Sequence, residues 1–158
     1  MEDRESPKLD RIDRAILNQL AHNARISMTE LGQKVGLSKT PVTTRVKRLE
    51  TDGLITGYRA EFSARKLGLE HVAFIEIRLS DTREDTLAEF NKAVREIAEV
   101  EECHLIAGGF DYLVKVRTRD IAEYRRVLSE SISRLPHVAS TSTFVSMESV
   151  RDWGVSQI

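Results

Sequence analysis

This chain of 158 residues has a single cysteine, three prolines, one tryptophan and almost no net charge. One cysteine excludes an intrachain disulfide framework and suits a reducing compartment, so we expect a cytoplasmic protein. No apolar run approaches membrane-spanning length, and the amino terminus MEDRESPK is too charged for a signal peptide, so we expect no membrane partner. The net charge of −1 excludes a diffuse basic field, and any surface for nucleic acid must therefore be local.

Motifs of catalysis and of metal binding are also missing from the sequence. Cys103 and His104 are adjacent in a predicted strand, so their side chains point to opposite faces and cannot bind one ion. The chain has no nucleophile motif and no P-loop, and the pair Gly108 and Gly109 does not open a predicted helix, as a phosphate cradle would. We therefore predict that this protein is not an enzyme, with no catalytic residue, no metal site and no cofactor.

Three short helices are predicted within residues 9–55. In the first, apolar residues recur at steps of three and four and form one stripe. Ser27 and Glu30 have the capping-box spacing at the start of the second helix, and Gly36 suits its end because glycine adopts a left-handed backbone easily. The link to Ser38, the expected N-cap of the third helix, is so short that the two helices must cross steeply. This is the helix-turn-helix layout.

The third helix has one face suited to DNA. Val42, Val46 and Leu49 fall on one side, where we expect them to pack on the other two helices. The other side carries cations, which reach phosphates or guanine edges, and threonines, whose hydroxyl and methyl groups match base edges. For Arg45, between the two faces, a phosphate contact and an ion pair are both open. We predict double-stranded DNA as the partner, with contacts from Lys39, Thr40, Thr43, Thr44, Arg45, Lys47 and Arg48.

The alternative for such a helix is an ordinary solvated face, and the charge count separates the two interpretations only weakly. Residues 1–62 hold 11 Lys or Arg against 9 Asp or Glu, and the rest of the chain holds 13 against 16. The positive charge is nevertheless local, and it lies on the one helix whose geometry can use it, which favours DNA contact.

The remaining residues repeat a strand-helix-strand pattern. A strand over residues 55–62, bent at Gly57, is expected first, as a wing or as an arm to the second domain, and a short turn follows over 63–68. The expected elements are then a strand over 71–79, a helix over 82–98, strands over 100–107 and 112–117, a helix over 121–135 and a strand over 138–150. The sequence therefore predicts an α+β chain: an N-terminal winged helix-turn-helix and a C-terminal ferredoxin-like βαββαβ domain, with both helices on one side of the sheet.

The uncovered face of that sheet predicts a homodimer. It carries apolar residues such as Val114, Val116 and Phe144, and an apolar sheet face without helices usually binds a second subunit. A dimer also suits DNA recognition, since its two helix-turn-helix domains, or reading heads, match the two half-sites of a palindrome.

The turn at residues 107–112, AGGFDY, is the candidate small-molecule site. Gly108 and Gly109 permit a sharp hairpin and leave backbone amides uncovered, where a carboxylate could dock, and Asp111 could bind an ammonium group. These groups suit the zwitterionic head of a free amino acid. An ordinary hairpin turn is the alternative.

The chain resembles the Lrp/AsnC family of feast/famine transcription regulators over residues 9–150. The resemblance is carried by LDRIDRAIL, ARIS-x-x-E-L, VGLS-x-x-P-V-x-x-R-V-x-R-L-E, DGLI-x-GY and ECHLIAGGFDYLVKVR. It implies an N-terminal helix-turn-helix, a C-terminal domain for effector binding and assembly, and dimers that assemble further, often to octamers, and wrap or bend DNA.

In that family the effector lies between dimers, against the turn between the second and third strands of one chain and the last strand of a neighbour. The resemblance therefore implies effector contacts from Gly108, Gly109, Phe110, Asp111, Phe144, Val145 and Ser146, with Ser133 as a further candidate. The chain is most similar to the branch that activates proline catabolism, which makes proline a candidate effector. The threonines after Pro41 replace the Cys-Leu-Glu of leucine-responsive members, so their DNA preference is not carried over.

The sequence thus predicts a transcriptional regulator of amino-acid metabolism that binds DNA and responds to a free amino acid. The alternative is an architectural DNA-binding protein whose second domain serves only assembly. The expected organisation is a disordered N-terminus over 1–8, the helix-turn-helix domain over 9–55, a linker or wing strand over 56–69, the regulatory and oligomerisation domain over 70–150, and a tail over 151–158.

Overall fold

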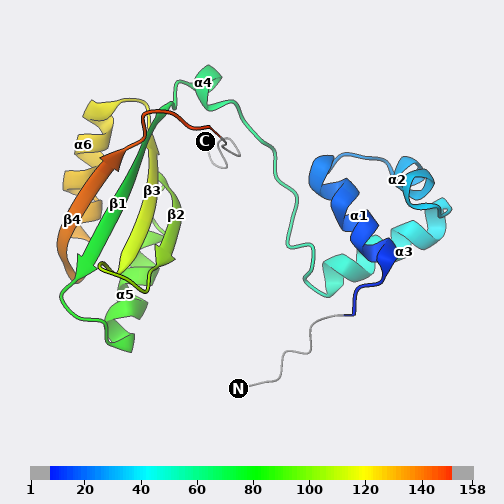
Figure 1. Ribbon diagram of the computed structural model, residues 1–158, viewed down its shortest axis with the longest axis horizontal. Coiled ribbons are helices and arrows are strands. Elements are labelled where there is room, and N and C mark those ends of the chain that lie inside the picture. The colour runs from blue at the N-terminus through cyan, green and yellow to red at the C-terminus, as the bar shows by residue number, and fades with distance from the viewer. Residues whose placement is uncertain (1–7, 151–158) are drawn as a thin grey trace. The chain divides into compact units, whose positions relative to one another are not determined.

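The computed structural model describes residues 8–150, which form two compact units that divide between Ala60 and Glu61 (Figure 1). The predictions of a disordered start and of a C-terminal tail fall, apart from Lys8, on residues outside this range. Within the described range, no helix has both the length and the apolar character needed to cross a membrane.

The first unit consists of three helices, as predicted: α1 (Arg11–His22), α2 (Met28–Val35) and α3 (Lys39–Thr51). The Ser27 hydroxyl accepts a hydrogen bond from the Glu30 amide at 3.2 Å and caps α2, and Gly36 ends that helix with φ of 75°. Ser38 occupies the N-cap position of α3 but makes no capping hydrogen bond through its side chain.

The core of this unit confirms the predicted inward face of α3. Val42 and Leu49 are fully buried, Val46 is nearly so, and they pack with residues of α1 and α2 in one apolar cluster. The steep crossing of α2 and α3 depends on Gly32, because a Cβ there would lie 2.6 Å from the Leu37 carbonyl oxygen. The turn can therefore lie directly against α2 only where that helix has no side chain.

The strand predicted over residues 55–62 is wrong. Residues 55–61 are all described and none is in a strand, and Phe62 forms only an isolated bridge. A strand needs a hydrogen-bonded partner, and the first unit offers only helices. The predicted turn at 63–68 is instead one helical turn, α4 (Ala64–Leu67), capped by the Ser63 hydroxyl and ended by Gly68 at φ of 68°.

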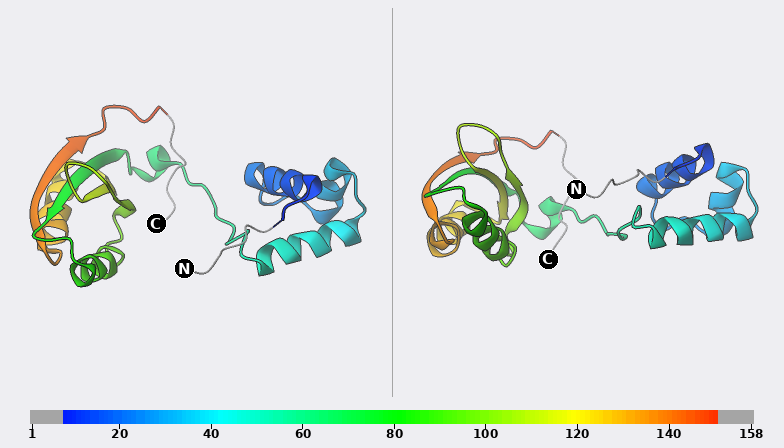
Figure 2. Two further views of the ribbon diagram at one scale, coloured as in Figure 1. Left: turned by 60° about the horizontal axis from the view of Figure 1, so that its bottom comes forward. Right: turned by 90° about the horizontal axis from the view of Figure 1, so that it is seen from below.

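The second unit is the predicted βαββαβ sheet. Its strands are β1 (His71–Leu79), β2 (Val100–Leu105), β3 (Tyr112–Thr118) and β4 (Val138–Val145), all antiparallel to their neighbours in the order β2-β3-β1-β4. Two helices, α5 (Glu84–Val94) and α6 (Ile121–Glu130), cover the same face of this sheet (Figures 1 and 2). The strands β2 and β4 are its two edges.

Both long helices are shorter than the sequence predicts. α5 ends at Val94 instead of residue 98, and Ile97 continues the apolar pattern in a turn that packs on the core. α6 ends at Glu130, and a 3₁₀ turn, η1 (Ile132–Arg134), carries the pattern on. β4 ends at Val145, before the predicted residue 150, although the Ser146 amide still bonds to the Val72 carbonyl oxygen of β1. At the ends of α5 and α6, apolar spacing therefore continues beyond regular helical hydrogen bonding.

The two faces of the sheet are assigned by the alternation along each strand. Val114 and Val116 are fully buried in the core beneath the helices, so their predicted place on the uncovered face is wrong. Phe144 does lie on the uncovered face, paired with Phe74 of β1. Its side chain is 53% exposed, so an apolar patch remains on this face.

The β2 end of the same face is charged. The buried Arg117 guanidinium lies 2.5 Å from the Glu101 carboxylate and donates at 3.1 Å to the Leu69 carbonyl oxygen. Lys115 lies 3.2 Å from the other oxygen of Glu101. The uncovered face thus joins an apolar region near β4 to an ion-paired region near β2.

Candidate DNA interface and effector site

The solvent-facing side of α3 presents the predicted DNA-contacting residues. Lys39, Thr40, Thr44 and Lys47 are exposed, and Thr43 is half-buried. The Thr43 hydroxyl donates at 2.7 Å to the Lys39 carbonyl oxygen, and the Thr44 hydroxyl donates at 3.2 Å to that of Thr40. Because each threonine gives its proton to the helix backbone, it presents a lone pair and a methyl group outward, the combination that suits amino groups and thymine methyls of bases.

Arg45 forms the ion pair that was one of its two predicted alternatives. Its guanidinium lies 2.6 Å from the Asp10 carboxylate and 2.8 Å from that of Asp13. Arg48, one turn further on, lies 2.5 Å from the second oxygen of Asp13. Asp10, the N-cap of α1, forms a reciprocal capping box with Asp13 in the first turn, so these two carboxylates together hold two residues of α3.

This network keeps its carboxylates ionised. The Asp13 side chain is only 1% exposed, and burial by itself raises its pKa, but hydrogen bonds from Arg45, the Asp10 amide and Arg48 outweigh that effect and lower the pKa. The backbone amide of Asp13 and the Arg45 guanidinium likewise lower the pKa of Asp10. The hydrophobic pattern of α1 does not indicate a buried role for Asp13, which lies off the apolar stripe. The signal for this network in the sequence is that Asp10 and Asp13 are three residues apart, as are Arg45 and Arg48.

The loop between β2 and β3, residues 106–111, carries the first group of predicted effector contacts. Gly108 and Gly109 are exposed, and a Cβ on Gly109 would meet no atom within 4 Å, so the backbone here is open to a ligand. Neither glycine has a positive φ, so the loop is not the tight left-handed turn that the pair permits. Phe110 is half-buried beside them.

Asp111 fastens this loop to the end of β1. Its amide donates to the Ile77 carbonyl oxygen at 2.9 Å, and one carboxylate oxygen accepts from the Leu79 amide at 2.7 Å. The second carboxylate oxygen has no hydrogen-bond partner among residues 8–150. Asp111 therefore has a structural role that the sequence did not indicate, and one oxygen left for an ammonium group.

The second group of predicted contacts lies at the opposite end of the sheet. Val145 pairs with Ala73, and the Ser146 amide donates to the Val72 carbonyl oxygen at 2.9 Å, both at the start of β1. Phe144 is the next residue of the same strand. Ser133, exposed in η1, precedes the turn whose His137 carbonyl bonds the Ser80 amide, so Ser133 belongs to the loop end. Within one chain, residues 144–146 and the loop cannot contact one ligand.

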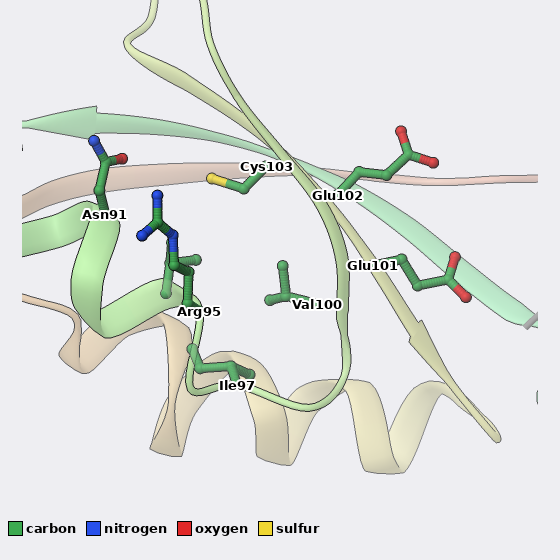
Figure 3. Close-up of a pocket in the computed structure, with 8 residues that line it drawn as sticks. Asn91, Arg95, Ile97, Val100, Glu101, Glu102 and Cys103 are labelled. Carbon is green, nitrogen blue, oxygen red and sulfur yellow. The ribbon is translucent and has the colours of Figure 1, made fainter. Parts of the chain in front are cut away.

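A separate hollow of about 320 Å³ lies between the C-terminal half of α5 and β2 (Figure 3). The Cys103 sulfur points toward Asn91 on α5 and toward Arg95, which follows that helix, whereas the carboxylates of Glu101 and Glu102 point away from it. His104, the next residue, is exposed on the other face beside Glu102, so the expected divergence of Cys103 and His104 is seen. This hollow contains none of the predicted effector residues, and no motif in the sequence indicates it.

The position of Cys103 leads to a prediction about its reactivity. Burial raises the pKa of this thiol to about 11. Since only the thiolate reacts, we expect alkylation by iodoacetamide at pH 8 to be about a hundredfold slower in the native protein than in the urea-unfolded chain. The chain has no other cysteine, so mass spectrometry of the labelled protein follows this site alone. Equal rates in the two states would contradict the raised pKa of this half-buried thiol.

Comparison with known families matches both units of the chain. The family model described as "Lrp/AsnC ligand binding domain" matches residues 72–154, and the one described as "Winged helix-turn-helix DNA-binding" matches residues 9–56.

Individual relatives agree with these matches. The chain is 61% identical over 142 residues to the proline dehydrogenase transcriptional activator of Rhodobacter capsulatus, covering 90% of this chain and 92% of that protein. It is 58% identical over 147 residues to the protein of the same name from Rhizobium radiobacter, covering 93% and 94%. Among solved structures, a transcriptional regulator of Neisseria meningitidis in complex with L-methionine superposes with a TM-score of 0.86 at 26% identity, covering 96% and 97%.

Proposed function

Because this chain belongs to the Lrp/AsnC family of transcriptional regulators, we propose that it is a sequence-specific regulator of amino-acid metabolism controlled by a free amino acid bound between its dimers. The observation that carries this proposal is the division of the candidate site. Open glycine amides and one unshared oxygen of Asp111 lie at one end of the sheet, and residues 144–146 lie at the other. A complete site therefore needs two chains.

The proposed chemistry follows from the groups on the loop. The amides of Gly108 and Gly109 suit the carboxylate of an amino acid, and the unshared oxygen of Asp111 suits its ammonium group. Phe144 of a neighbouring chain would supply apolar surface for the side chain from the uncovered face. Val145 is also exposed, but its side chain lies on the opposite face of the same strand. Ser133 and Ser146 offer hydroxyl groups at the two ends. No cofactor is needed.

Proline is the effector that we propose to test first. Two relatives, 61% and 58% identical to this chain, are both named as transcriptional activators of proline dehydrogenase, and the structural neighbour from Neisseria meningitidis holds L-methionine, which supports an amino acid as the class of ligand. A regulator of transcription acts where the DNA is, so we propose that the protein works in the cytoplasm.

The proposed DNA contacts come from the outer side of α3. Lys39 and Lys47 would neutralise phosphates, and Thr40, Thr43 and Thr44 would meet base edges in the major groove. A homodimer built on the uncovered sheet face would present two such helices, and further assembly of dimers, as in an octamer, would bend or wrap the DNA. These assemblies are supported by the exposed apolar patch around Phe144.

An effector can change such a regulator only through different affinities for two states. An amino acid held between dimers would favour the assembly in which the loop of one chain and the last strand of another fit around it. That assembly would set the angle between paired reading heads, and with it the bend of the DNA and the access of polymerase.

The test is a thermal-shift titration of the full-length protein with each common amino acid. A ligand that binds only the folded state adds about 2.7 kcal/mol of stability at a concentration of 100 times its Kd. We expect a selective rise in melting temperature, with proline first among the candidates, and the same amino acid should change the sedimentation of the protein. If no amino acid shifts the melting temperature at millimolar concentrations, the architectural alternative is favoured.

A further inference from the structure

We propose that Asp13 is a positioning residue for DNA recognition, which holds α3 through Arg45 and Arg48 and keeps both arginines out of the phosphate contacts. This inference rests on the proposed role of α3 as the reading helix. It divides the cations of α3 into two classes: arginines that fix the helix, and lysines that bind the DNA backbone.

The geometry of the network is that of a brace between two helices. Asp13 uses one carboxylate oxygen for Arg45, at 2.8 Å, and the other for Arg48, at 2.5 Å. Asp10 adds a contact to Arg45 at 2.6 Å. Arg45 and Arg48 are one turn apart on α3, so two points on that helix are fixed to one buried side chain of α1. Two fixed points restrain rotation of α3 about its axis, and this rotation decides which side chains enter the groove.

The charges of the network cancel. Two carboxylates and two guanidinium groups add no net charge to the surface of this unit. Lys39 and Lys47, by contrast, are exposed on α3 and have no ion pair among the described residues. Binding of these lysines to phosphates releases counterions from the DNA, whereas a guanidinium already neutralised by a carboxylate releases few.

The burial of Asp13 disfavours a change in which Arg45 or Arg48 leaves its carboxylate to bind a DNA phosphate. Its side chain is only 1% exposed, so an Arg48 or Arg45 that left it for DNA would leave one oxygen of a buried carboxylate without its cationic partner. Removal of one partner of a buried pair is strongly unfavourable, because the remaining charge has lost its hydration as well. The pairs are therefore expected to persist when the protein binds DNA.

The experiment compares Asp13→Asn with Asp52→Asn in the full-length protein. Asp52 follows α3, is exposed and has no ion pair among residues 8–150, so its variant makes the same charge change without touching the network. The two probes are a duplex selected by the wild-type protein from a random pool and a mixed-sequence duplex of equal length. Affinity for each is measured over a series of salt concentrations.

We expect Asp13→Asn to bind the mixed-sequence duplex more tightly, because Arg48 loses its only ion pair among the described residues, while Arg45 keeps Asp10 alone. The slope of log K against log salt should steepen by about 1, and the preference for the selected duplex should fall at least about tenfold. Asp52→Asn should change neither the slope nor the preference by comparable amounts. Loss of stability alone would weaken both complexes without steepening the slope. A wild-type slope and preference in Asp13→Asn, or equal changes in Asp52→Asn, would overturn the proposal.

A second pair of variants keeps the proposal testable if Asp13→Asn does not fold. Arg48→Gln should lower the preference for the selected duplex with little change of slope, and Lys47→Gln should reduce the slope by about 0.9 with little change of preference. An equal loss of slope in both variants would make Arg48 a phosphate ligand and overturn the proposal. If the wild-type protein fails to prefer its selected duplex, the proposed sequence specificity fails, and the two slopes alone decide the role of Arg48.

Discussion

Replacement of Phe144 by aspartate is expected to separate the chains and to lower the affinity for DNA with two half-sites by about 10²–10⁴-fold. Phe144 is 53% exposed on the uncovered face of the sheet, beside Phe74 of the neighbouring strand. If a second copy covers this patch, the new carboxylate must lose its hydration in an apolar contact, which costs several kcal/mol. Each reading head would then bind alone, and the gain from linked binding of two heads would be lost.

Sedimentation velocity of the full-length protein measures the first part of this prediction, and binding to a duplex with two half-sites measures the second. Ile121→Asp is the matched control, because Ile121 is also 53% exposed but lies at the start of α6, in the helix layer. A carboxylate suits the first turn of a helix, so this variant should keep the wild-type assembly. If Phe144→Asp remains assembled and folded, the uncovered face is not where the chains meet.

Local signals explain why most of the fold could be predicted from the sequence. Ser27 predicts the start of α2 because its hydroxyl accepts a hydrogen bond from an amide of the first turn. Gly36 predicts the end because it adopts the left-handed backbone there without strain. The same holds for β1, whose bounds, His71–Leu79, are those predicted from its apolar pattern. Where a boundary depends on neighbours in space, as at the end of α5, the pattern runs past it.

Alternation along a strand shows which residues share a face, but it does not show which face the helices cover. Val114 and Val116 must share a face because they are two residues apart, but which face depends on where the helices pack. The strand predicted over residues 55–62 failed for a related reason, since β-propensity without a partner strand leaves the backbone unpaired.

Two residues of the candidate sites have contacts that the sequence predictions did not assign. Asp13 meets Arg45 and Arg48 across 32 and 35 positions of chain, and Asp111 meets the Leu79 amide across 32. Both are acidic residues in or beside sequence motifs whose nearest neighbours in the chain do not include these partners. Their partners are set by the packing of elements, which is why the DNA-reading helix and the loop could be located from the sequence but their supports could not.

Asp111→Asn is expected to abolish the response to the amino acid while leaving DNA affinity without amino acid unchanged within about twofold. The asparagine oxygen can still accept the hydrogen bond from the Leu79 amide, so the loop should keep its place. The charge that would hold the ammonium group is gone, and a hydrogen bond to a charged group contributes about 1.5–3 kcal/mol. The amino acid should then bind about 10- to 100-fold more weakly, and the thermal shift at millimolar ligand should disappear.

Asp111→Ala separates contact with the ligand from support of the loop. Alanine removes the charge and also leaves the Leu79 amide without its acceptor, so this variant should be destabilised by about 1 kcal/mol in addition to losing the response. If alanine abolishes the response but asparagine preserves it, Asp111 acts by holding the loop against β1, and the ammonium group is bound elsewhere. If both variants lose the response and only alanine loses stability, the carboxylate contacts the ligand directly. Thermal melts without amino acid and titrations with it distinguish these outcomes in the same samples.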